Sequence, residues 1–278
     1  MKIHRIAVMA LAVLMSCQPA KKEPAKAEAT TVAAKNITGE EISYAADNIT
    51  MKGFIAYDAA QTGKRPGVIV VHEWWGHNEY ARQRAKMLAE MGYVALAVDM
   101  YGDGKKAEHP QDAGKFASET MKNFKGAKAR FEKAVETLKN NPNVDASHIA
   151  AIGYCFGGGV VLNMARQGID MKAVVSFHGS LGAAEPAKEG VVKSRVLVCN
   201  GAADKFVSEK DIEGFKKEMD AAKVNYVFKS YDGAVHGFTN PAVDSLGKKF
   251  NLPLAYNAKA DADSWADMTA LFKEVFGK

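Results

Sequence analysis

The sequence predicts a mainly parallel α/β sheet with helices on both faces, and three observations indicate this fold class. Strand-like and helix-like segments alternate along the chain with short connections, which is typical of three-layer α/β proteins. Several strand-like segments are continuously apolar, as in residues 67–72, which is typical of strands covered on both faces. No internal repeat and no Pro/Gly-rich linker divides residues 37–278, so one domain is expected there.

Residues 1–16 have the form of an export signal. Met1–Arg5 is basic, and Ile6–Met15 is apolar but too short to span a bilayer permanently. Cys17 follows Leu-Met-Ser, an ending that resembles the lipobox of bacterial lipoproteins, in which the cysteine is lipidated and becomes the first mature residue. A plain secretory signal cleaved at another bond is the alternative.

The composition of residues 17–36 predicts a disordered tether, because this segment has no aromatic residue and no periodic apolar face. Signal and tether together predict an exported bacterial lipoprotein at the periplasmic face of a membrane, either the inner or the outer one. We expect the protein to contact that membrane through its lipid anchor only.

The bulk composition is that of an ordinary soluble domain, with 47% hydrophobic and 25% charged residues among 278. Leaving out Lys2 and Arg5 of the predicted signal leaves 35 basic residues against 32 acidic ones, too small an excess to predict nucleic-acid binding.

If Cys17 carries lipid, Cys155 and Cys199 are the remaining thiols, and the sequence does not decide whether they form a disulfide. No metal-ligand spacing occurs, so neither a metal nor a cofactor is expected, and a monomer is expected.

The strands and helices of the domain are predicted from their periodicity. Alternating runs around Asp47-Asn48 predict a β-hairpin, and short apolar runs predict the buried strands that follow it. The predicted strand segments are 41–57 (the hairpin), 67–72, 93–98, 148–153, 172–177, 195–200 and 225–231. Apolar residues at helical spacing predict helices over 79–91, 115–140, 156–166, 208–222 and 258–276.

Local signals support several of these boundaries. Pro142 helps to stop the helix predicted over 115–140. Ser208 opens the next-to-last helix, with Asp211 as an acidic partner in its first turn. The last helix has one apolar face, made of Trp265, Met268, Leu271, Phe272 and Val275.

Residues 153–157, Gly-Tyr-Cys-Phe-Gly, place Cys155 at a turn between a predicted strand and a predicted helix. A nucleophile at such a sharp turn crowds its neighbours, and glycines two residues away on either side relieve that crowding. The turn also puts the thiol at a helix N-terminus, where unpaired N–H groups and the helix dipole favour a thiolate. The N–H of Phe156 is placed to donate to an oxyanion.

Two polar residues further along the chain fit the same chemistry. Asp204 and His236 each follow a predicted strand, in the order nucleophile, acid, histidine that α/β hydrolases use. In such sites the carboxylate orients the general base that activates the nucleophile. The alternatives are a buried core cysteine, a loop-capping Asp204 and a surface His236, whereas a P-loop is excluded because no Gly-Lys-Ser/Thr follows.

Glu73 and Trp74 directly follow the predicted strand 67–72, next to where a second oxyanion donor normally lies. A carboxylate near a thiol disfavours the thiolate, because two negative charges then lie close together. Glu73 is therefore either a switch that takes the thiol proton or a solvated loop residue.

These motifs resemble the dienelactone hydrolase family from about Gly53 to Phe276. The likeness rests on the stretches G-V-I-V-V-H-E-W-W-G, G-Y-C-F-G-G, G-A-A-D, G-A-V-H-G-F and A-Y-N-A-K-A-D-A-D-S-W. The resemblance implies the three-layer α/β-hydrolase fold and a Cys155–His236–Asp204 triad. It also implies an oxyanion hole from the N–H groups of Trp74 and Phe156.

Two further roles are implied by the resemblance alone. Glu73 is expected to hydrogen-bond the resting thiol, and Arg82 to pair with that glutamate and contact the substrate carboxylate. Type members of the family carry a second substrate arginine shortly after the catalytic histidine, where this chain reads H-G-F-T-N-P. Cytosolic members also lack an export signal and a tether, so the dienelactone substrate itself does not carry over.

We therefore expect an exported, carboxymethylenebutenolidase-like hydrolase whose partner is a small ester or lactone. One alternative is a catalytically inactive hydrolase-fold lipoprotein that acts in binding, since a fold alone does not fix an activity. The other is a thiol-redox protein, for which Cys199 is the sole candidate for a resolving cysteine.

Overall fold

The computed structural model describes Met1, residues 34–46 and residues 48–277. The predicted signal beyond Met1, Cys17 and most of the predicted tether lie outside these residues and stay predictions. The chain divides into Met1–Ala33 and Ala34–Lys278, and every strand and helix given below belongs to the second unit.

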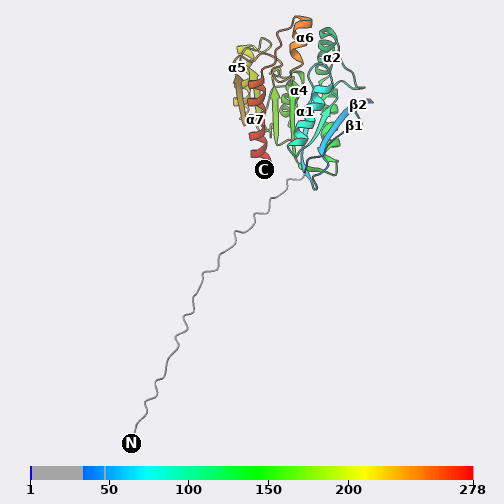
Figure 1. Cartoon of the computed structure of the whole chain (residues 1–278). Helices are drawn as coiled ribbons and strands as arrows, with labels where there is room; N and C mark the ends of the chain where they lie inside the picture. Colours follow the sequence, from blue (N-terminus) through cyan, green and yellow to red (C-terminus); the bar gives the residue numbers. More distant parts are fainter. Residues whose placement is uncertain (2–33, 47, 278) are drawn as a thin grey trace. The chain divides into compact units, whose positions relative to one another are not determined.

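The described residues form one eight-stranded sheet (Figure 1). In chain order its strands are β1 (Ile37–Ala46), β2 (Ile49–Asp58), β3 (Arg65–Val71), β4 (Val94–Val98), β5 (Val144–Tyr154), β6 (Ala173–Phe177), β7 (Arg195–Gly201) and β8 (Tyr226–Tyr231). Their order in the sheet is β1-β2-β4-β3-β5-β6-β7-β8. The hairpin strand β2 is antiparallel to β1 and β4, and all other neighbours are parallel. The predicted fold class, with its N-terminal hairpin, is confirmed.

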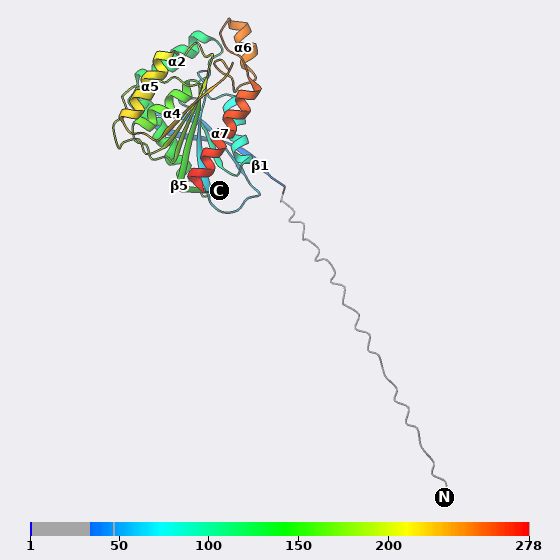
Figure 2. The same cartoon turned by 90° about the vertical axis from the view of Figure 1, so that its left-hand side faces the viewer.

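Helices cover both faces of this sheet. They are α1 (Glu79–Glu90), α2 (Pro110–Lys122), α3 (Phe124–Lys139), α4 (Phe156–Arg166), α5 (Glu209–Ala221), α6 (Val243–Phe250) and α7 (Ala258–Phe276). One hydrophobic cluster joins the sheet to α3, α4 and α5, and a second joins it to α1 and α7. Figure 2 shows α4 and α5 on one side of the strands and α7 on the other.

The alternation of side chains along β3 explains why its sequence is apolar throughout. Ile69 and Val71 belong to the first cluster, whereas Val68 and Val70 belong to the second. All four are fully buried, because successive side chains of a strand point to opposite faces and each face carries a helix layer.

Two features of the helices differ from the expectation. The helix predicted over 115–140 is two helices, α2 and α3, separated at Asn123. The side chain of Asn123 accepts a hydrogen bond from the N–H of Gly126 and so caps α3. The short helix α6 was not predicted, since eight residues give too few apolar positions to establish a period.

Candidate active site

Cys155 lies between the end of β5 and the first residue of α4, in a backbone conformation with φ of 53°. This left-handed region is uncommon for a residue with a side chain. A Cβ atom at Gly153 would lie 2.1 Å from the carbonyl oxygen of Gly157, and one at Gly157 would lie 2.4 Å from that of Val71. Both flanking positions therefore require glycine, as the sequence pattern predicts.

The structure brings Asp204 and His236 together at the ends of β7 and β8. His236 Nδ1 lies 2.8 Å from Asp204 Oδ2, and the imidazole also makes a hydrogen-bonding contact with Cys155. The Asp204 side chain is fully buried, and its other oxygen accepts the N–H of Phe206 at 2.8 Å. Both carboxylate oxygens are thus fixed, and the carboxylate holds the imidazole in one orientation.

The charges around His236 favour its protonated form. Burial by itself would lower the pKa of His236, but the negative charge of Cys155 and the hydrogen bonds with Asp204 and Cys155 raise this pKa to about 10. The structure thus places a histidine that favours its protonated form beside the side chain of Cys155.

The two residues predicted to supply oxyanion donors, Trp74 and Phe156, line the same cleft as Cys155. Phe156 is the first residue of α4, so its N–H has no partner inside the helix. Trp74 follows β3, and its carbonyl oxygen accepts a hydrogen bond from the Tyr101 hydroxyl at 2.8 Å. Trp74 and Phe156 both line the cleft onto which Cys155 opens, which is where oxyanion donors are needed.

The cleft has a volume of about 280 Å³ and a mainly apolar lining. Its lining residues are Trp74, Ala117, Cys155, Phe156, Ser180, Phe206, Val207, His236 and Leu254. No lysine or arginine belongs to this lining within the described part of the chain. The cleft therefore suits a small substrate without a charged group.

Glu73 does not line the cleft, and it is not a solvated loop residue, since it is only 3% exposed. Asn240 Nδ2 donates to Glu73 Oε2 at 2.7 Å. Burial raises the pKa of Glu73 to about 7, although the hydrogen bond from Asn240 and the charges of His236 and Arg84 act in the opposite direction. Glu73 is thus poised to exchange a proton near neutral pH.

The expected pair between Arg82 and Glu73 is not formed. Arg82 binds Glu41 of the hairpin in a two-pronged ion pair and does not line the cleft. Arg84 is the arginine whose charge acts on Glu73, and its guanidinium also pairs with Asp261 at 2.6 Å. Residues two apart on a helix point in nearly opposite directions, so Arg82 faces the hairpin when Arg84 faces the interior.

The sequence reasoning missed a buried polar chain beside His236. Arg84 Nε donates to the Tyr80 hydroxyl at 3.1 Å. The Tyr80 hydroxyl lies 2.6 Å from the Thr239 hydroxyl. The Thr239 hydroxyl lies 2.8 Å from His178 Nε2. The His178 and His236 rings pack edge to face, with their centroids 5.3 Å apart. The only sequence signal was the proximity of Thr239 to His236 in the chain, which is also typical of an ordinary loop.

Cys199 does not complete a redox pair with Cys155. Both cysteines are free, and Cys199 is fully buried on the side of the sheet that faces α7. Burial raises the pKa of Cys199 to about 12, which keeps this thiol protonated and unreactive. The geometry therefore disfavours the thiol-redox alternative.

The family model of the dienelactone hydrolases matches residues 51–276. The chain belongs to the dienelactone hydrolase family. A solved structure named m3DLH is 38% identical, with a TM-score of 0.82 over 86% of this chain and 98% of that one. A dienelactone hydrolase-like promiscuous phosphotriesterase from metagenomic libraries is 34% identical, with a TM-score of 0.79 over 86% and 98% of the two chains.

A relative from Synechocystis sp., named "Putative carboxymethylenebutenolidase", is 27% identical over 241 residues, which cover 81% of this chain and 92% of that protein. This dienelactone hydrolase family member is accordingly an α/β hydrolase by fold. Within the described residues, no helix is long and apolar enough to cross a membrane.

Replacing Glu73 by glutamine is expected to change how stability depends on pH. Folding raises the pKa of Glu73, so in the wild type its contribution to stability is present below pH 4.5 and is lost as the pH rises to about 7. Glutamine cannot ionise, so between these pH values the unfolding free energy of Glu73→Gln should gain about 3 kcal/mol relative to wild type. Urea unfolding at several pH values measures this difference. The exposed control Glu213→Gln should follow the wild-type curve, and parallel curves for all three proteins would refute the assignment.

Proposed function

We propose that this protein hydrolyses small neutral esters or lactones, with Cys155 as the nucleophile. The observation that carries the proposal is the arrangement of Cys155, His236 and Asp204 on an apolar cleft without lysine or arginine in its described lining. The butenolidase named among the relatives supports a lactone as one substrate class.

In the first half of the reaction the Cys155 thiolate attacks the carbonyl carbon of the ester. The oxyanion that forms accepts hydrogen bonds from the N–H groups of Phe156 and Trp74. When this tetrahedral intermediate collapses, the imidazolium of His236 gives its proton to the departing alcohol oxygen. The products are the free alcohol, or the open chain of a lactone, and a thioester on Cys155.

In the second half water replaces the alcohol. Neutral His236 takes a proton from a water molecule, whose oxygen attacks the thioester carbonyl. Collapse of the second intermediate releases the acid and regenerates the thiolate beside the imidazolium. Asp204 stays ionised throughout and stabilises the positive charge on His236.

Glu73 has a supporting role in this proposal. A carboxylate that exchanges its proton near pH 7 adjusts the negative charge close to His236. Glu73 accepts a hydrogen bond from Asn240 and does not line the cleft, so we assign it to charge control and not to substrate binding.

The proposal also includes the place where the enzyme works. Residues 1–16 would direct export, a lipid on Cys17 would anchor the protein at the periplasmic face of a membrane, and residues 17–36 would serve as a tether. The catalytic domain over residues 37–278 would then act there as a monomer.

Removing the nucleophile should abolish turnover. For Cys155→Ala and His236→Ala we expect kcat for p-nitrophenyl acetate to fall by about 10³-fold or more, with little change in Tm. Asp204→Asn should be less severe, because it disturbs the orientation of His236 and leaves the nucleophile in place. The control Ser180→Ala alters the same cleft without touching these groups and should keep its activity. Wild-type turnover by Cys155→Ala would rule the mechanism out.

The cleft should not prefer an anionic ester over a neutral one. For each protein we compare kcat/KM for mono-p-nitrophenyl succinate with kcat/KM for p-nitrophenyl acetate. The ratio of the two should change by less than about twofold in Arg82→Ala, because Arg82 pairs with Glu41 of the hairpin and exposed ion pairs of this kind contribute little energy. Strong selectivity for the succinate that disappears in Arg82→Ala would instead place this arginine at the substrate.

Loss of Cys17 should release the protein from membranes. Without a lipidated cysteine the short apolar signal cannot anchor the chain stably, so Cys17→Ala should appear uncleaved or in the soluble fraction. Fractionation and mass spectrometry of the N-terminus measure both outcomes. Normal processing together with unchanged membrane partitioning would contradict the lipoprotein assignment.

A further inference from the structure

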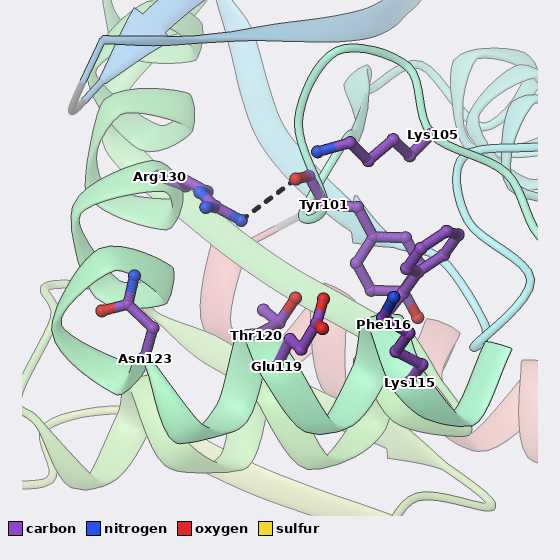
Figure 3. Close-up of a pocket in the computed structure, with 8 residues that line it drawn as sticks. All are labelled: Tyr101, Lys105, Lys115, Phe116, Glu119, Thr120, Asn123 and Arg130. Atoms are coloured by element: carbon purple, nitrogen blue, oxygen red, sulfur yellow. Dashed lines mark hydrogen bonds between the residues drawn. The ribbon is translucent and has the colours of Figure 1, made fainter. Parts of the chain in front are cut away.

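A second and larger cavity of about 480 Å³ lies beside the candidate active site (Figure 3). Lys115, Phe116 and Glu119 of α2 form one part of its lining, and Arg130 of α3 and Tyr101 form another. The break between α2 and α3 thus allows the two helices to enclose a pocket. The mechanism above uses none of these side chains.

Arg130 is an unusual residue to find in this pocket, because its side chain is only 8% exposed and has no acidic partner in the described part of the chain. Its Nη1 donates to the carbonyl oxygens of Met100 at 2.7 Å and Tyr101 at 3.2 Å. Its Nε is buried and has no hydrogen-bond partner among the described residues. A guanidinium is always charged, and burying a charge without a counter-ion is costly.

The other charges of the pocket add to this excess of positive charge. Lys105 and Lys115 line it as well, against a single acidic lining residue, Glu119. Lys105 meets the exposed Asp103 at 3.7 Å, a long contact in which water screens most of the attraction. Figure 3 shows the Lys105 ammonium directed toward the carbonyl oxygen of Tyr101 and the guanidinium of Arg130.

We propose that this pocket binds a small anion with two or more acidic oxygens, such as a di- or tricarboxylate or a phosphate. With Nη1 donating to two carbonyl oxygens and Nε buried, Nη2 of Arg130 is the charged donor left for a carboxylate or phosphate oxygen in the pocket. Lys105 and Lys115 supply point charges at the opening, where a second acidic group would lie. Tyr101 and Phe116 provide an apolar wall for the carbon skeleton of a carboxylate ligand.

The anion is a separate ligand and not the acidic end of the ester. Tyr101 stands between pocket and cleft, since it lines the pocket while its ring packs at 5.3 Å from Phe156, which lines the cleft. The Tyr101 hydroxyl also holds the carbonyl of Trp74, so the wall of the pocket supports a residue of the proposed oxyanion hole. This inference goes beyond the proposed function and does not depend on it.

Calorimetric titration of the purified protein with citrate, and separately with inorganic phosphate, tests the site at low salt. At least one of the two should bind, and Arg130→Gln should weaken the binding by about tenfold or more. Lys115→Ala should weaken it severalfold, whereas Glu119→Gln should strengthen it because a repulsive charge is removed. The control Lys122→Ala changes an exposed lysine of the same helix that does not line the pocket, and it should leave the dissociation constant unchanged.

Opposite effects of Lys115→Ala and Glu119→Gln distinguish a charge-based site from a loss of folding, which would weaken binding in both variants. Absence of binding by both anions, or equal dissociation constants in Lys115→Ala and Lys122→Ala, would overturn the proposal.

Alkylating the partly exposed Cys155 with iodoacetamide blocks the cleft and so distinguishes binding in the pocket from binding in the cleft. Citrate or phosphate binding that survives alkylation supports a separate site. Binding that is lost on alkylation would place the anion in the cleft and refute the proposal.

Discussion

The backbone turn at Cys155 is the constraint on which the rest of the site depends. A positive φ at a residue with a side chain costs energy, and here the tight packing of the α4 N-terminus against the ends of β3 and β5 maintains it. The hydrogen bond from Gly157 N–H to the carbonyl of His72 ties this turn to the neighbouring strand end. The turn places the Cys155 side chain at the N-terminus of α4.

Three ionisable side chains near this turn, those of His236, Asp204 and Glu73, influence one another. His236 lies between the Cys155 side chain and the buried carboxylate of Asp204, and both of these neighbours raise its pKa. Glu73 is buried as well, and burial brings its pKa close to neutrality. A single change of protonation at Glu73 therefore acts on the same imidazole that Asp204 orients, although the two carboxylates lie far apart in the sequence.

Sequence reasoning succeeded where the signal was local and failed where it depended on helix rotation. The glycines around Cys155 predicted the turn, because close approach of backbone atoms leaves no alternative residue. Arg82 was expected beside Glu73, yet Arg84 lies nearer to it. Both arginines are on α1, and only the packing of α1 against β2 and β4 decides which of them faces inward.

The sequence by itself determined the fold class, the strand-helix order and the turn at Cys155, since each follows from periodicity or from backbone sterics within a few residues. Tertiary structure alone decided the apolar character of the cleft, the contact of Asn240 with Glu73 and the cationic pocket around Arg130. These features join residues far apart in the chain. Their distances depend on how helices rotate and pack on the sheet, which no local pattern encodes.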